Sequence, residues 1–186
     1  MGRSKALLDA DGQPFLVRVV RSLRDGGCDP VVVVLREGAG PEAEMALALG
    51  SRVVVNPDPR AGPISSIRAA LDSLGAGIEG IVVLPVDHPG VKSETVASLV
   101  QAGREARGRI VLPRMQGRRG HPALFPASVL DELRNPGLEG GARSVVRRSR
   151  DRVVEVEVED PGVLEDIDDP DRYRMIFGVP PGQVRE

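Results

Sequence analysis

Aromatic side chains are scarce in this chain of 186 residues, which has no tryptophan, one tyrosine and three phenylalanines. Proteins that bind single-stranded nucleic acids stack the bases on aromatic side chains, so the composition argues against such a platform. The net charge of -2 also provides no basic field that would attract a phosphate backbone. We therefore expect no nucleic-acid partner.

Cysteine is rare and long apolar runs are missing. The single cysteine, Cys28, cannot form an internal disulfide, and an inert thiol is its simplest interpretation. No apolar stretch approaches the length of a membrane span, and the first residues contain no secretory hydrophobic region. We expect a cytoplasmic protein with no membrane partner.

The chain does contain an alternation of strand and helix patterns. The runs 31–35 and 81–86 are apolar without polar alternation, which is typical of strands buried on both faces of a parallel sheet. A turn-linked pair near 110–125 predicts one antiparallel element, and strict alternation over 152–160 predicts an exposed or edge strand. Helical spacing predicts helices at 14–24, 42–49, 64–74, 93–102 (with Ser93 as its N-cap), 127–133 and 142–148. The order indicates an open α/β sheet with helices on both faces.

Ligands of open α/β sheets bind at the carboxyl ends of the strands, here the loops after Leu35, Asn56, Val86 and Leu112. Asp87 ends one of these strands, where a carboxylate can receive a divalent cation. Mg²⁺ needs only one or two protein carboxylates when phosphate oxygens complete its shell. The alternative is an aspartate that caps the next segment or accepts hydrogen bonds from loop amides.

A second acidic cluster lies near the end of the chain. It contains Asp166, Asp168, Asp169 and Asp171. Asp168 or Asp169 can cap a helix that begins at Pro170, but a cap explains only one of these acids. A metal site shared with the strand-end aspartate would use Asp166 or Asp168, which lie on one face of an extended segment.

Two basic or glycine-rich segments are candidates for phosphate binding. They contain Gly2, Arg3 and Lys5 in the first, and Gly62, Ser65 and Ser66 in the second. The second segment opens a helix, and exposed backbone N–H groups at a helix start bind anions. Neither segment fits the phosphate-loop or dinucleotide-binding patterns. The alternative for each is an ordinary solvated loop.

The two histidines, His88 and His121, carry no hydrolase motif with them. What remains is a set of acids suited to magnesium and cations suited to phosphates. Those groups serve phosphoryl or nucleotidyl transfer, where catalysis consists mainly of positioning and charge neutralisation.

Several motifs together resemble the MobA-like nucleotidyltransferases, most closely the molybdenum cofactor cytidylyltransferase branch. The opening "MGRSKALLDADGQPFL" is similar to the second half of that family's first loop, and "GPISSIRAAL" to its nucleotide-contacting loop and helix. "VVLPVDHPGV" is similar to the strand with the metal-binding aspartate, and "GRRGHPALF" to the segment that distinguishes the cytidylyltransferase branch. "VVEVEVEDPGVLEDIDDPDRY" is similar to the family's closing motif, so the resemblance runs from residue 1 to about residue 175.

This resemblance implies a Rossmann-like three-layer α/β/α sandwich over residues 1–178, with a tail at 179–186. The sheet would be mostly parallel with one antiparallel strand. The family's first strand and the first half of its loop have no counterpart in this sequence. We therefore expect a missing strand beside 31–35 or 81–86, with exposed apolar edges.

The resemblance also implies a reaction. A substrate phosphate attacks the α-phosphorus of a nucleoside triphosphate, here expected to be CTP, and pyrophosphate leaves. Mg²⁺ would be the cofactor and molybdopterin the phosphorylated acceptor, with a molybdoenzyme or its chaperone as a further partner.

Residue roles follow by position in the motifs. Lys5 and Asp87 would be catalytic, and Lys5 would bind the triphosphate with Gly2 and Arg3 beside it. Asp87 would hold the metal, with Asp166 or Asp168 as second ligand. Gly62, Ser65 and Ser66 would line the nucleotide pocket, and His88, Gly120, His121 and Pro122 would shape the acceptor side.

The sequence departs from the family pattern at several positions. His88 stands where the family has a neutral amide, and Asp169 where it has threonine. Two other hypotheses remain: a catalytically impaired module of the same fold that binds nucleotides or partner proteins, and a nucleotidyltransferase for a sugar or polyol phosphate.

Overall fold

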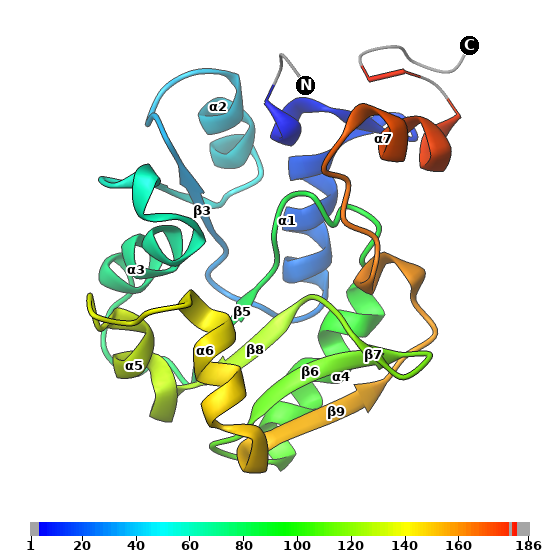
Figure 1. Cartoon of the computed structure of the whole chain (residues 1–186). Helices are drawn as coiled ribbons and strands as arrows, with labels where there is room; N and C mark the ends of the chain where they lie inside the picture. Colours follow the sequence, from blue (N-terminus) through cyan, green and yellow to red (C-terminus); the bar gives the residue numbers. More distant parts are fainter. Residues whose placement is uncertain (1–3, 179, 182–186) are drawn as a thin grey trace.

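The computed structural model describes residues 4–178 and 180–181 and has a layered α/β architecture (Figure 1). The helices are α1 (Phe15–Asp25), α2 (Pro41–Ala48), α3 (Pro63–Ser73), α4 (Ser93–Glu105), α5 (Leu130–Arg134), α6 (Gly141–Arg148) and α7 (Pro170–Phe177). The strands are β1 (Asp9–Ala10), β2 (Gln13–Pro14), β3 (Val32–Leu35), β4 (Arg52–Val55), β5 (Gly80–Val83), β6 (Ile110–Met115), β7 (Arg118–Arg119), β8 (Ala123–Pro126) and β9 (Val153–Glu157). In the described part of the chain, no helix combines the length and the apolar character needed to cross a membrane.

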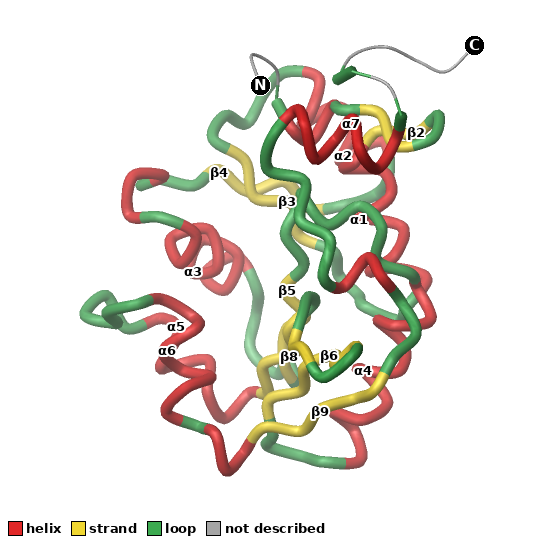
Figure 2. Tube along the Cα trace, turned by 45° about the vertical axis from the view of Figure 1, so that its right-hand side comes forward, coloured by secondary structure: helices red, strands yellow, loops and turns green. Residues whose placement is uncertain are grey.

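Helices cover both faces of the strands. α3, α5 and α6 lie on one side and α1 and α4 on the other, with the strands between them (Figure 2). Val20, Ala46 and Val96 join α1, α2 and α4 in one apolar cluster. Leu71 and Val145 belong to a second cluster, which joins α3, α5 and α6 to β6 and β8. The predicted three-layer sandwich is confirmed.

Strand directions also match the prediction. β4 runs parallel to β3, and β9 runs parallel to β6. β8 lies between β5 and β6 and is antiparallel to both, so it is the antiparallel element predicted near 110–125. Within the described residues β9 pairs only with β6, which agrees with the edge strand predicted from its alternating sequence.

The sheet is interrupted between β3 and β5, as expected from the sequence. Among the described residues, β3 pairs only with β4, and β5 pairs only with β8. The strands nevertheless follow one another in the order β4, β3, β5, β8 (Figure 2). Val82, at the middle of β5, packs against the same apolar cluster as Val33 of β3.

The interruption explains why one expectation is wrong. The runs 31–35 and 81–86 do not form strands that are buried on both faces: most of β3 and all of β5 are only half-buried. Within residues 4–178 and 180–181, each of the two strands has one edge without a neighbouring strand, so its side chains are less completely covered. The second strand is also shorter than predicted, because β5 ends at Val83 and the chain continues to Asp87 as a loop.

The first and last elements of the described chain pack together. α7 lies beside the N-terminal segment in both views (Figures 1 and 2). Tyr173 and Phe177 of α7 surround Phe15, and the Tyr173 hydroxyl donates a hydrogen bond of 2.6 Å to the Asp9 carbonyl. The predicted tail at 179–186 lies largely outside the described residues. This packing brings the acidic segment before α7 close to the start of the chain.

Candidate active site

Lys5 joins two of the predicted acidic residues. It lies in a 3-10 turn, Lys5–Leu7, whose backbone is anchored by the buried side chain of Ala6. Its Nζ is 3.5 Å from Asp87 Oδ2, in the loop after β5, and also pairs with Asp168 Oδ1, just before α7. Three segments that are distant in sequence therefore meet at one ammonium group.

The charges of this group stabilise one another. Burial lowers the pKa of Lys5, but its hydrogen bonds and charge interactions with Asp168 and Asp87 outweigh burial and raise the pKa overall. The hydrogen bond from Lys5, together with its charge, lowers the pKa of Asp168. Lys5 is therefore cationic and Asp168 anionic at neutral pH.

The same carboxylates are the donors available to a divalent metal. Within residues 4–178 and 180–181, no three or more His, Cys, Asp or Glu side chains come close enough together to hold a metal ion. Asp87 and Asp168 instead converge on one cation, the Lys5 ammonium. Such a pair fits Mg²⁺ or Mn²⁺, which can take one or two protein carboxylates and complete the shell with phosphate oxygens and water.

The structure distinguishes the two candidates for the second acid. Asp168 is the one that shares Lys5 with Asp87. Asp166 is exposed, and its negative charge only partly offsets the effects that lower the pKa of His121. Asp169 caps α7, because its side chain accepts hydrogen bonds from the backbone N–H groups of Asp171 and Arg172. The capping function and the contact with Lys5 are therefore carried by neighbouring aspartates.

His88 and His121 pack against each other, with ring centroids 4.8 Å apart. His88 is 7% exposed, and its Nδ1 lies 3.2 Å from the Gly162 carbonyl oxygen. Burial, followed by the effects of His88 and Arg143, lowers the pKa of His121 to about 4, so this imidazole is neutral at pH 7. Within the described residues, His121 Nδ1 is buried and has no hydrogen-bond partner. The pair has the environment of packed loop residues, and its predicted acceptor contacts stay a prediction.

Gly120 has a steric reason to be glycine. A Cβ at this position would lie 2.1 Å from the Val163 carbonyl oxygen. The same oxygen accepts a hydrogen bond of 2.9 Å from the His121 backbone N–H, and Pro122 follows across a cis peptide bond. The segment predicted to bind the acceptor is therefore packed directly against the loop around residue 163.

Asn56, which the sequence indicates only as the end of a strand, organises the start of α3. Asn56, buried at the end of β4, donates from Nδ2 to Ser65 Oγ at 2.8 Å and to Ser66 Oγ at 3.1 Å. Gly62 precedes the helix with φ +80°, and Ser65 Oγ donates to its carbonyl at 2.7 Å. The signal for Asn56 was its position, a polar side chain at the carboxyl end of an apolar strand. Gly2 and Arg3 lie outside the described residues.

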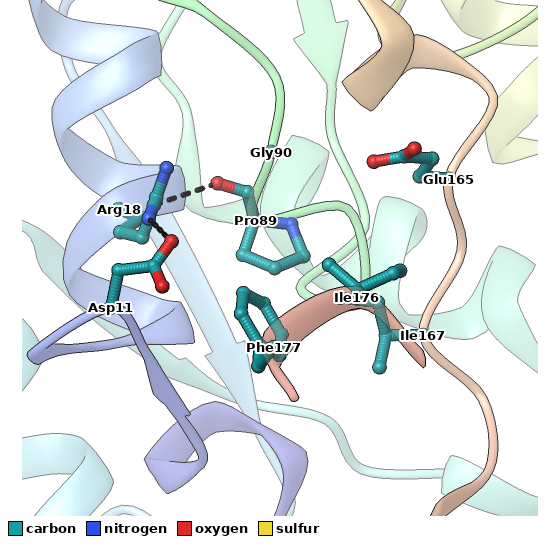
Figure 3. A pocket seen from close by; sticks show the side chains of 8 residues that line it. All are labelled: Asp11, Arg18, Pro89, Gly90, Glu165, Ile167, Ile176 and Phe177. Atoms are coloured by element: carbon teal, nitrogen blue, oxygen red, sulfur yellow. Dashed lines mark hydrogen bonds and ion pairs between the residues drawn. The ribbon is translucent and has the colours of Figure 1, made fainter. Parts of the chain in front are cut away.

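A cavity of about 160 Å³ lies between α1, α7 and the loop after β5 (Figure 3). Arg18 lines this cavity, with Nε donating to the Pro89 carbonyl at 3.0 Å and Nη1 lying 3.7 Å from Asp11 Oδ2. Ile176 and Phe177 form its apolar wall. Ligand pockets are usually larger, roughly 300–1,000 Å³. Neither Lys5 nor Asp87 lines this cavity, so we assign it to packing between elements.

The sequence model of one family, described as the MobA-like NTP transferase domain, matches residues 1–153. The chain belongs to this family. The family description names an NTP transferase, and the convergence of Lys5 with Asp87 and Asp168 agrees with a nucleotidyltransferase.

Curated relatives of this MobA-like chain carry several names. The sequence is 33% identical over 149 residues to a probable molybdenum cofactor guanylyltransferase of Opitutus terrae, covering 79% of this chain and 70% of the relative. It is 30% identical over 185 residues to nicotine blue oxidoreductase of Paenarthrobacter nicotinovorans, covering 95% and 90%. The family is therefore shown by sequence over most of the chain.

Solved structures show the same fold. The crystal structure of Rv0371c from Mycobacterium tuberculosis H37Rv in complex with manganese matches with a TM-score of 0.76 and 27% identity, covering 96% of this chain and 94% of that one.

Proposed function

We propose that this MobA-like nucleotidyltransferase transfers a nucleoside monophosphate from a nucleoside triphosphate to the phosphate of molybdopterin, with Mg²⁺ as cofactor. A phosphate oxygen of the acceptor forms a bond to the α-phosphorus, and the bond from that phosphorus to the β-phosphate bridging oxygen breaks. Pyrophosphate carries away the bonding electron pair. We place the reaction in the cytoplasm, with a molybdoenzyme or its chaperone as recipient of the product.

The observation that supports this proposal best is the convergence of Lys5, Asp87 and Asp168. Asp87 and Asp168 are the residues that would hold the metal, whose bound charge would neutralise the developing charge on the phosphates. The Lys5 ammonium is close enough to contact phosphates bound at the same carboxylates. The structure of Rv0371c in complex with manganese supports a divalent cation in this fold.

Two nucleotides, CTP and GTP, are candidates for the substrate. The Gly120–Pro122 segment resembles the cytidylyltransferase branch and favours CTP. Relatives named as guanylyltransferases, such as the one from Opitutus terrae, favour GTP. Both nucleotides should therefore be compared at equal concentration in one assay.

The experiment is pyrophosphate release from CTP or GTP in the presence of molybdopterin and Mg²⁺. We expect Asp87→Asn to lower the rate by at least about a hundredfold, because a lost electrostatic contact to the transition state typically has an effect of that size. Asp171→Asn is the matched control, since it removes the same charge from a side chain that is 88% exposed. The control should keep the full rate.

Equal rates for wild type and Asp87→Asn would contradict the assigned role of Asp87. Nucleotide binding without pyrophosphate release would favour the catalytically impaired module instead. Release with a sugar phosphate but not with molybdopterin would favour the remaining hypothesis.

A further inference from the structure

Lys5 occupies the space between the two carboxylates that a metal would use. Its Nζ contacts Asp87 Oδ2 at 3.5 Å and pairs with Asp168 Oδ1. A divalent cation held by these two carboxylates would take the place that the ammonium now occupies. An ammonium in its present place would then face a like charge at close range, which is unfavourable.

We propose that Lys5 and the divalent metal compete for Asp87 and Asp168, and that Lys5 moves to the nucleotide phosphates when metal and nucleotide bind. The inference rests on the proposed function, because it assigns the metal and the triphosphate to this site. It gives Lys5 a second role as the cation that holds the site together before loading.

The backbone supports a movement of the side chain alone. Ala6, inside the short turn, and Leu8, directly after it, are 7% and 2% exposed and fix the chain at this point. The Lys5 side chain is 31% exposed, so it has access to solvent and to a ligand. A lysine stem has four rotatable carbons, and its ammonium can exchange partners without a backbone shift.

The two carboxylates stay together when Lys5 leaves. The Ile167 backbone N–H donates a hydrogen bond of 2.9 Å to the Asp87 carbonyl, and the Ile167 side chain is 2% exposed. This bond ties the segment before α7 to the loop after β5. Two neighbouring negative charges without a cation repel each other, so departure of Lys5 favours arrival of the metal.

Metal and nucleotide should therefore help each other to bind. Without nucleotide, the metal must displace Lys5 from two ion pairs. With nucleotide present, the phosphates give the ammonium a new anionic partner and supply further metal ligands. The coupling between the two ligands is reciprocal by thermodynamic linkage.

The test is Mn²⁺ binding measured by electron paramagnetic resonance, with Mn²⁺ alone and then with a nucleoside triphosphate. We expect Lys5→Met to bind Mn²⁺ about tenfold more tightly than wild type in the absence of nucleotide, since breaking a pair of partly exposed ion pairs has an effect of this order. Lys92→Met is the control, because Lys92 is the only other lysine of the chain. It should bind Mn²⁺ as wild type does. In Lys5→Met, nucleotide should enhance metal binding less than in wild type.

A second measurement on the unmodified protein guards against misfolding of the variant. With two lysines, selective labelling gives two side-chain resonances, and the Lys92→Met spectrum assigns them. Mg²⁺ should shift the Lys5 resonance and leave the Lys92 resonance in place. The inference would be overturned if Lys5→Met and wild type bound Mn²⁺ with equal affinity. It would also be overturned if the Lys5 resonance did not shift at saturating Mg²⁺. Both readouts are independent of turnover, so an inactive chain that shows the exchange would refute the proposed function alone.

Discussion

Asp160 is a buried carboxylate, 2% exposed, that connects the start of α4 to the loop around residue 162. Its Oδ2 accepts hydrogen bonds from the Lys92 backbone N–H at 2.9 Å and from Thr95 Oγ1 at 2.6 Å. Its Oδ1 accepts one from the Gly162 N–H at 3.1 Å. The carboxylate therefore acts as an N-cap supplied from a distant segment, placed where the helix dipole favours a negative charge.

We expect Asp160→Ala to lower the free energy of unfolding by about 2–3 kcal/mol, because it leaves buried donors without a partner. Ser93→Ala is the matched comparison at the same helix end. Ser93 is the first residue of α4 and not its cap, so we expect a change within about 0.5 kcal/mol. Urea unfolding of both variants measures the difference. A larger loss in Ser93→Ala would mean that the local cap dominates after all.

Ser93 and Asp160 differ in whether a local sequence pattern can identify their role at the start of α4. Ser93 is predicted as the N-cap because capping rules look only at the neighbouring residues. Asp160 lies 68 residues from the amide it caps, so no local pattern connects them. Asp87 was identifiable as an acid that follows an apolar run, Lys5 as part of a basic opening segment and Asp168 as part of an acidic cluster. Their convergence depended on packing that the sequence pattern does not contain.

At the level of elements, α7 positions half of the candidate metal site. It packs through Tyr173 and Phe177 onto Phe15, with the centroids of the Phe15 and Phe177 rings 5.9 Å apart. Asp168 lies two residues before the helix, and Asp169 caps it. The aromatic cluster thus holds an acid of the site against the N-terminal turn.

We expect Phe177→Ala to lower the free energy of unfolding by about 3–5 kcal/mol, as is typical for a buried phenylalanine. Phe177 is 7% exposed, whereas Met175 of the same helix is 75% exposed. Met175→Ala should therefore have little effect. Hydrogen exchange read by mass spectrometry should show lost protection in α7 and in residues 5–14 for the first variant only. Unchanged protection in these segments would contradict the coupling of the two chain ends.

Element boundaries were predicted closely for some helices and less closely for others and for one strand. The helix expected at 93–102 runs to Glu105 as α4, and the helix expected at 127–133 begins as a 3-10 turn before α5. The helices expected at 42–49, 64–74 and 142–148 correspond to α2, α3 and α6 within a residue or two. The apolar run 81–86 looks like one strand, but its partner β8 begins at Ala123, opposite Val83. The run therefore leaves the sheet where hydrogen bonding ends, although its side chains remain apolar. An apolar pattern reports burial, while the partner decides the length of the strand.

For the whole molecule, alternating strand and helix patterns were enough to predict the three layers, because each apolar face must be covered by another element. The position of β8 in the sheet was harder to predict from the sequence than the layers were. A strand that follows a turn is expected beside the preceding strand, and β8 does pair with β6, but it also pairs along its full length with β5. Only the complete set of strand partners shows that β8 lies between β5 and β6 and is antiparallel to both.

The interrupted sheet predicts uneven stability across the molecule. β6 pairs with β8 on one side and β9 on the other, and β8 pairs on both sides with β5 and β6. Within the described residues, β3 and β5 each pair on one side only. Amides without a strand partner open to solvent in small local fluctuations, whereas amides between two partners need a larger opening.

We therefore expect the backbone amides of β3 and β5 to exchange with deuterium at least about tenfold faster than those of β6, measured by NMR under native conditions. β8 serves as an internal control, because it is paired on both sides and should match β6. The order of rates should persist at low protein concentration, where pairing between copies is absent. Equal protection of β3, β5 and β6 in dilute solution would mean that the two parts of the sheet are joined there, since only a strand partner on the second edge would slow those amides to the rate of β6.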